Sequence, residues 1–134
     1  MRHIAAYCGA AITFCVMDYI WLTKVAKNFY QSQMGGLMAV EVKMVPAIIF
    51  YLLYLVGVVV LAISPALREQ SPMLAAGLGL LLGVVAYASY DLTNMATLKD
   101  WSMTLTLVDI AWGAVVTATS AVAGFYASRM FYGH

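Results

Sequence analysis

Charged residues are scarce in this chain of 134 residues. Only 10% of them are Asp, Glu, Lys or Arg, whereas 64% are hydrophobic. A soluble domain is on average about one quarter charged and about half apolar. So short a chain cannot bury that much apolar surface within itself, and the composition therefore predicts a single-domain integral membrane protein. The net charge of +1 gives no indication of nucleic-acid binding.

Histidine and cysteine are also rare. His3 and His134 stand at opposite ends of the chain, which excludes histidine-cluster iron sites and most zinc sites. Cys8 and Cys15 would lie about 10 Å apart on one helix, too far for a disulfide, and neither belongs to a CxxC motif. The sequence also lacks a nucleophile elbow and a nucleotide-binding loop. We therefore expect no metal ion and no cofactor.

Four long apolar stretches predict an all-α membrane protein, in which four transmembrane helices form a compact bundle. Each stretch reaches the roughly 20 residues that a helix needs to cross a bilayer. Their approximate bounds are 4–23, 44–63, 73–92 and 103–128. The pairs Ser64-Pro65 and Ser71-Pro72 predict breaks between the second and third spans. The link between the first two spans is apolar for a loop, so we expect a short interfacial helix or flap there.

Four spans place both chain ends on one side of the membrane, which we name side A; the opposite side is side B. The link between the second and third spans is also on side A. Side A carries Arg2, Arg68 and Arg129, and side B carries Lys24, Lys27, Lys43 and Lys99. Because these numbers are nearly equal, positive-inside counting gives no orientation.

Three aspartates interrupt the apolar spans, all near side B: Asp18, Asp91 and Asp109. At 1.5 Å per residue, each lies within about 10 Å of the side B boundary. Tyr51 lies at a similar depth, and Tyr87 shares a helix face with Asp91. The other halves of the spans are mostly aliphatic. This one-sided polarity predicts an acidic and aromatic pocket that opens to side B and is closed toward side A by apolar packing.

Small and polar residues recur at steps of three and four along the fourth span. They are Thr106, Asp109, Gly113, Thr117, Ser120 and Gly124. Such a stripe allows close helix packing, so we expect Asp109 to face the bundle. An intramembrane acid indicates a functional site, yet a structural bond from Asp109 to Tyr87 or Tyr51 stays an alternative. For Asp18 and Asp91 the alternative is a carboxylate in water at the membrane boundary or at a helix end.

Several blocks of the sequence resemble the bacterial membrane protein family catalogued as domain of unknown function 2177. They are Asp18-Tyr19-Ile20-Trp21-Leu22, Phe50-Tyr51-Leu52-Leu53-Tyr54, Tyr90-Asp91-Leu92-Thr93-Asn94, Ala96-Thr97-Leu98-Lys99-Asp100-Trp101 and Val108-Asp109-Ile110-Ala111-Trp112-Gly113. The similarity covers nearly the whole chain and implies a multi-pass protein of the bacterial inner (cytoplasmic) membrane. It implies no activity. Separately, Asp18 and Trp21 share an Asp-x-x-Trp spacing with Asp109 and Trp112, a match short enough to arise by chance.

Our leading hypothesis is a membrane protein that binds a small or amphipathic ligand, such as a small transporter coupled to protons or cations. Asp18 and Asp109 would bind a cation or exchange a proton. The full set of predicted ligand-binding residues is Asp18, Tyr51, Tyr87, Asp91, Asn94, Asp109 and Trp112, with Asp91 and Asn94 at the mouth of the pocket. No catalytic residue is assigned.

Two other functions are consistent with the same residues. The first is a membrane enzyme that uses two carboxyl groups as acid and base on a lipid or membrane-soluble substrate. The second is a structural subunit whose polar face meets another membrane protein. In each case we expect membrane lipids as partners and no nucleic acid. A transporter, in contrast, needs access from both sides of the membrane, and the apolar half toward side A offers no path in one copy. A homodimer would supply that path.

Overall fold

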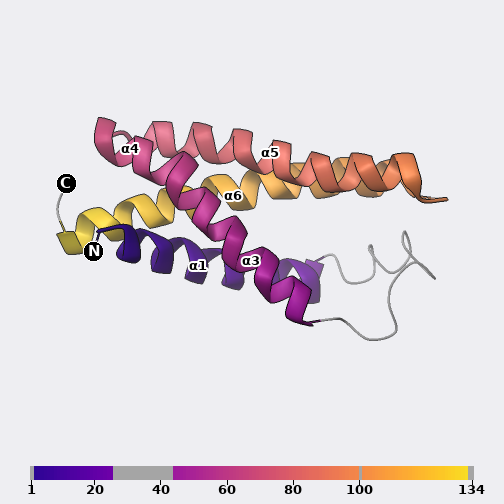
Figure 1. Ribbon diagram of the computed structural model, residues 1–134, viewed down its shortest axis with the longest axis horizontal. Helices are drawn as coiled ribbons and strands as arrows, with labels where there is room; N and C mark the ends of the chain where they lie inside the picture. Colours follow the sequence, from indigo (N-terminus) through magenta and orange to yellow (C-terminus); the bar gives the residue numbers. More distant parts are fainter. Residues whose placement is uncertain (1, 26–43, 100, 133–134) are drawn as a thin grey trace.

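The computed structural model describes residues 2–25, 44–99 and 101–132, and every regular element within them is helical (Figure 1). Four helices are long and apolar enough to cross a membrane: Arg2–Ile20, Ile48–Glu69, Pro72–Thr97 and Met103–Phe131. The predicted all-α class with four membrane-crossing helices is therefore confirmed. The predicted interfacial segment between the first two spans falls on residues 26–43, outside the described residues.

The first helix, α1 (Arg2–Ile20), ends in a π-helical turn, η1 (Trp21–Val25). Next, α3 (Met44–Val58), the π-helical turn η3 (Val59–Ile63) and α4 (Ser64–Glu69) follow one another without a break and form one rod. The last two helices are α5 (Pro72–Thr97) and α6 (Met103–Tyr132). The start of α1, the end of α6 and α4 all lie at one end of the molecule, as an even number of spans requires (Figure 1).

The predicted helix break at Ser64-Pro65 is wrong, because the rod runs through it. A proline inside a helix lacks its N–H group and crowds the carbonyl group four residues earlier, here that of Leu61. In η3 the N–H of Ser64 donates to the carbonyl oxygen of Val59, five residues back, in the wider pattern of a π-turn. The wider turn makes room for Pro65, which then occupies the first turn of α4, where its missing donor costs little.

The second predicted break, at Ser71-Pro72, is confirmed. Gln70 adopts a left-handed backbone conformation with φ of 52°, and the N–H of Ser71 donates to the carbonyl oxygen of Ala66 at 3.0 Å. These features end α4. The hydroxyl of Ser71 then accepts a bond from the N–H of Leu74 at 3.0 Å and caps the start of α5.

Helix α5 continues beyond the predicted end of the third span at residue 92. Its last turns contain hydroxyl and amide side chains that resemble a loop in sequence. However, the hydroxyl of Thr97 donates to the carbonyl oxygen of Thr93 at 2.8 Å. The N–H of Leu98 donates to the main-chain carbonyl oxygen of Asn94 at 2.7 Å. Because these polar groups bond to carbonyl oxygens of their own helix, they do not have to leave the helix to find partners in water. Asp91 is therefore inside a helix rather than at its end.

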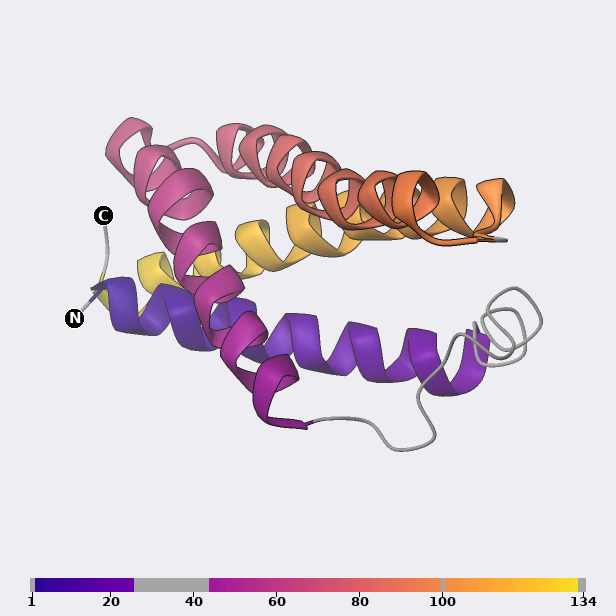
Figure 2. The same cartoon turned by 45° about the vertical axis from the view of Figure 1, so that its right-hand side comes forward.

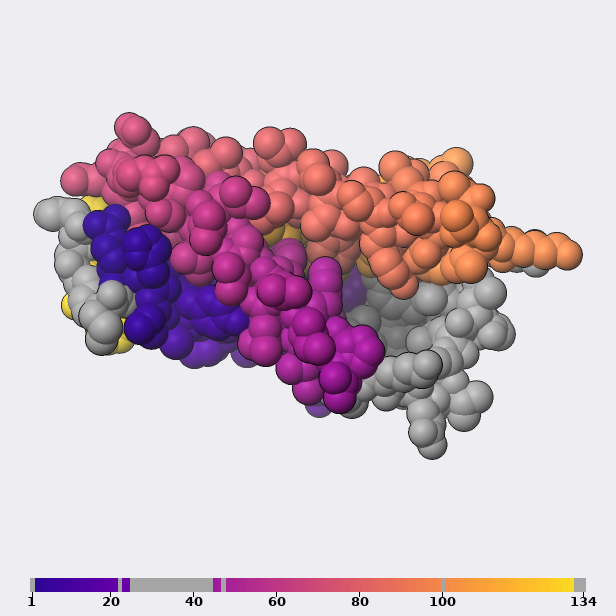
Figure 3. Space-filling view, in the orientation of Figure 1, coloured from indigo at the N-terminus to yellow at the C-terminus, as the bar shows by residue number. Residues whose placement is uncertain are grey.

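Helix α6 is the central element of the bundle (Figures 1 and 2). Its half toward side B packs on α5, where a Cβ atom built on Gly83 would lie 2.9 Å from the Cα atom of Ala114. Its half toward side A packs on α1, where a Cβ atom on Gly124 would lie 2.6 Å from the carbonyl oxygen of Ala6. The α3–α4 rod crosses the outside of this layer diagonally (Figure 3). The predicted packing role of small residues in the fourth span is thus confirmed.

The Gly83→Ala substitution is expected to lower the free energy of unfolding by about 1–3 kcal/mol, because the added methyl group forces α5 away from α6. On the same helix, a Cβ atom at Gly77 meets nothing within 4 Å. Gly77→Ala is therefore the matched control, expected to be neutral or to stabilise by up to about 1 kcal/mol through helix propensity. Unfolding in mixed micelles, followed by circular dichroism, measures both. Equal midpoints would contradict the close packing of α5 on α6.

Candidate functional site

Asp18 lies where α1 approaches α3 and α6, and it accepts a bond from each neighbour. The hydroxyl of Tyr51 donates to its Oδ2 atom and the indole Nε1–H of Trp112 donates to its Oδ1 atom, both at 3.4 Å. These distances are longer than the usual 2.7–3.2 Å, so each bond is weak and leaves the carboxylate open to a closer partner. Asp18 is half-buried, and the structure brings three predicted site residues together here.

Asp91 and Asp109 form a pair between α5 and α6, with their side chains in hydrogen-bonding contact. Such a bond requires a proton on one of the two carboxyl groups, because an ionised carboxylate has no hydrogen to donate. Asp91 is only 1% exposed, and no N–H or hydroxyl group of the described residues donates to its buried Oδ2 atom. The alternative of a solvated carboxylate at a helix end is therefore wrong for Asp91.

The pair and Asp18 belong to one electrostatic neighbourhood. Asp109 lies close enough to Asp18 to interact with it, and Tyr87 lies near both acids and near Tyr51. The ring of Tyr87 covers Gly113 so closely that a Cβ atom there would lie 2.6 Å from the ring atom Cδ2. We name the set of Asp18, Tyr51, Tyr87, Asp91, Asp109 and Trp112 the acidic–aromatic cluster.

Asn94, the remaining predicted residue, lies one turn from Asp91 on α5, in the direction of side B. The side chain of Asn94 is half-buried. Its main-chain carbonyl oxygen accepts the N–H of Leu98 at the end of the helix. This position fits a residue at the mouth of the cluster. Among the described residues, no three acidic, histidine or cysteine side chains converge with the geometry of metal ligands. The acids are thus arranged as a pair and a separate single carboxylate.

Sequence reasoning missed the partner of Trp112. Its ring stacks on that of Trp21, with centroids 4.4 Å apart and planes 7° from parallel. A tryptophan near the side B boundary predicts only a membrane-interface anchor at Trp21. The signal that could have found the stack is the repeated Asp-x-x-Trp spacing, because it places each tryptophan one turn from an aspartate of the cluster. The stack places two ring systems beside the carboxyl group of Asp18.

A second missed contact closes the cluster toward the membrane interior. Tyr54 of α3 is buried and shares a hydrogen bond with the hydroxyl of Thr117 on α6. The ring of Phe14 lies against both Tyr51 and Tyr54, with centroid distances of 5.4 and 5.0 Å. Further toward side A the core is largely aliphatic and aromatic, as in Ala6, Ala10, Val58, Ile63, Val116 and Phe125. The predicted apolar packing on that side agrees with this core.

Four membrane-crossing helices around one polar cluster define a small multi-pass integral membrane protein. The chain belongs to the family described as predicted membrane protein, domain of unknown function 2177, whose model matches residues 3–126. The resemblance noted from the sequence blocks is therefore confirmed. Comparisons with curated proteins and with solved structures found no match.

Proposed function

We propose that the acidic–aromatic cluster binds a hydrophobic organic cation and exchanges it for a proton. One observation carries this proposal: the Asp91–Asp109 pair, in which a carboxyl group that is only 1% exposed contacts a second carboxyl group. Two carboxylates in contact repel each other, and a bound cation would remove that cost. A pair that shares one proton can also release it when a cation arrives.

The surroundings of the pair favour a cation as the ligand. Asp18 adds a second carboxyl group, and Trp112, Trp21 and Tyr51 add ring faces and edges beside it. Aromatic rings attract cations through their negative faces, and this attraction grows when water is excluded. An organic cation with apolar substituents would match both the carboxyl groups and the rings, and would partition into the bilayer from which it enters.

The exchange would proceed without any covalent step. The cation enters beside Asp18, the shared proton leaves the pair for water on side B, and the pair becomes fully ionised around the positive charge. Net charge in the cluster is then unchanged. We further propose that this exchange serves a small transporter in the bacterial inner membrane, with a homodimer supplying the path to side A that the packed core of one copy closes.

A second candidate is favoured by the same pair. Two carboxyl groups that share a proton can act as acid and base on a membrane-soluble substrate. In that case the cluster would convert its ligand, and the bound compound would leave chemically changed. Mass analysis of the ligand recovered after incubation distinguishes the two functions, because a transporter returns it intact.

Binding of tetraphenylphosphonium to the purified full chain, with a pH indicator in weak buffer, tests the proposed exchange. We expect about one proton released per cation bound, as the shared proton of the pair requires. Asp91→Asn still donates a hydrogen bond to Asp109 but holds no acidic proton. It should therefore release almost none and bind at least about tenfold more weakly, a loss of ~1.4 kcal/mol.

The control for this experiment is Glu69→Gln, which removes an exposed acid at the side A end of α4. It is expected to match the wild type in both affinity and proton release. If wild-type protein binds the cation without releasing a proton, or if Asp91→Asn behaves like wild type, the exchange is not a property of this pair.

A further inference from the structure

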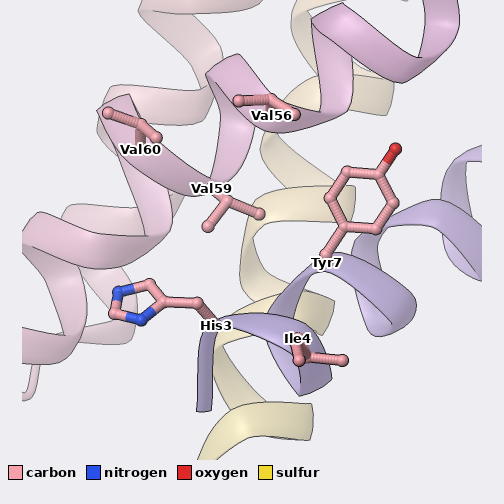
Figure 4. Close-up of a pocket in the computed structure, with 6 residues that line it drawn as sticks. All are labelled: His3, Ile4, Tyr7, Val56, Val59 and Val60. Carbon is pink, nitrogen blue, oxygen red and sulfur yellow. The ribbon is translucent and has the colours of Figure 1, made fainter. Parts of the chain in front are cut away.

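An apolar groove lies at the side A end of the bundle, far along α1 from Asp18. It separates the first turns of α1 from the rod at the junction of α3 and η3, and its volume is about 280 Å³ (Figure 4). Its lining residues are His3, Ile4, Tyr7, Val56, Val59 and Val60. Figure 4 shows the side chain of Val59 between those of His3 and Tyr7. The walls therefore offer mainly aliphatic and ring surface.

The groove opens on the outer surface of two helices that are long and apolar enough to cross a membrane. Ile4 and Val60 are 58% and 57% exposed, and they belong to helices that cross the bilayer. The hydroxyl of Tyr7 donates to the carbonyl oxygen of Leu52 at 3.4 Å, so its polar atom has a partner on α3. An apolar depression on such a surface is filled by an acyl chain rather than by water.

Basic residues stand at the end of this groove. The hydroxyl oxygen of Ser64 accepts a bond from the Nη1–H of Arg68 at 3.2 Å and lies 3.3 Å from the Nε2 atom of His3. The guanidinium group is permanently charged, and its bond to Ser64 uses one of five N–H donors. Arg2 precedes His3 in the chain, and Glu69 is the acid next to Arg68. These residues lie where α1 begins and α4 ends, at the side A end of the bundle.

We propose that this groove holds one acyl chain of an anionic phospholipid whose phosphate group is bound by Arg68 and His3. The apolar lining matches the chain, and the positive charge at the side A end matches the headgroup. Arginine binds phosphate oxygens with two parallel hydrogen bonds, and basic pockets beside transmembrane helices bind lipid headgroups. The site is separate from the acidic–aromatic cluster and does not depend on the function proposed for it.

Native mass spectrometry of the full chain tests this site, by titration with phosphatidylglycerol and phosphatidylcholine that carry identical acyl chains. We expect one phosphatidylglycerol to be retained with at least about fivefold higher affinity, since one basic residue near the membrane surface contributes about that factor. Arg68→Gln should remove this preference. Val60→Trp should fill the groove and weaken the binding of both lipids.

Two variants serve as matched controls. Arg129→Gln removes another side A arginine, whose guanidinium lies over the ring of Phe125 at 5.5 Å. Leu61→Trp enlarges the neighbour of Val60. Leu61 is as exposed as Val60, at 57%, but it does not line the groove. Both should leave the preference and the stoichiometry unchanged.

Three results would overturn the proposal. One is a wild-type protein without preference between the two lipids. Another is an Arg129→Gln variant that loses as much preference as Arg68→Gln, because the charge effect would then be diffuse. The third is displacement of phosphatidylglycerol by glycerol 3-phosphate, since the site would then bind a free phosphate rather than a lipid.

Discussion

Asp109→Asn is expected to weaken tetraphenylphosphonium binding on the order of a hundredfold, ~2.7 kcal/mol, while the folded protein still accumulates in the membrane. Asp109 touches Asp91, and its charge also acts on Asp18, so its loss affects both acidic parts of the cluster. Removing a carboxylate that faces a bound and desolvated cation typically costs about 2–5 kcal/mol of binding. Asparagine has the same shape and keeps a hydrogen bond to Asp91, which is why the fold should survive.

The double variant Asp91→Asn/Asp109→Asn shows whether the two residues act as one unit. Its loss of binding free energy should be smaller than the sum of the two single losses, because residues that share one proton are not independent. Isothermal titration gives the affinities, and size-exclusion chromatography of detergent-solubilised protein reports the fold. If Asp109→Asn instead removes folded protein from the membrane, Asp109 is a structural residue that joins α5 to α6. Losses that add up in the double variant would contradict the shared proton.

Gly113→Ala is expected to lower the free energy of unfolding by about 3 kcal/mol, the upper end of the usual cost of overpacking. The new methyl group would occupy the place of the Tyr87 ring, with 2.6 Å between its carbon and the ring atom Cδ2. Since Tyr87 belongs to the acidic–aromatic cluster, its displacement should also weaken cation binding. Unfolding in mixed micelles and titration with tetraphenylphosphonium measure these two effects on the same sample.

A compensating substitution distinguishes this clash from a general loss of helix packing. Tyr87→Ala alone leaves a cavity and should destabilise by about 3–5 kcal/mol, as other aromatic truncations do. In the double variant with Gly113→Ala, the methyl group enters that cavity instead of meeting a ring. We expect the combined loss to be smaller than the sum of the single losses by about 2 kcal/mol. Strict additivity would mean that the two residues do not contact each other.

The helices were predictable from sequence because membrane spans depend on length and hydropathy, which are local properties. The predicted helix ends were wrong where a helix continues through residues that usually break helices or form loops. Pro65 reads as a helix breaker, yet a π-turn five residues long precedes it and lets the rod continue. Thr93 and Thr97 read as loop residues, yet one bonds to the other along the helix. In the first case a main-chain bond of the π-turn decided the outcome, and in the second a side-chain hydroxyl that bonds to the main chain of its own helix.

The site was predictable in its residues more than in its pairings. Depth along each span correctly indicated that Asp18, Asp91 and Asp109 share one end of the bundle. The partner of each acid depends on how the helices are rotated about their axes, and hydropathy is nearly uniform around such helices. Sequence alone therefore did not predict the bond between Asp91 and Asp109 or the stack of Trp21 on Trp112.

The π-turn η3 also sets how the two ends of the α3–α4 rod are rotated relative to each other about the rod axis. A π-turn holds one more residue than an α-turn, and each residue turns a helix by about 100°. The extra residue thus sets the rotation of Ser64 and Arg68 relative to Tyr51 and Tyr54 on the same rod. Tyr51 faces Asp18 and Tyr54 faces Thr117, while Ser64 faces His3. A one-residue deletion within η3 would disengage the basic end of the rod from α1 and leave its aromatic end in register.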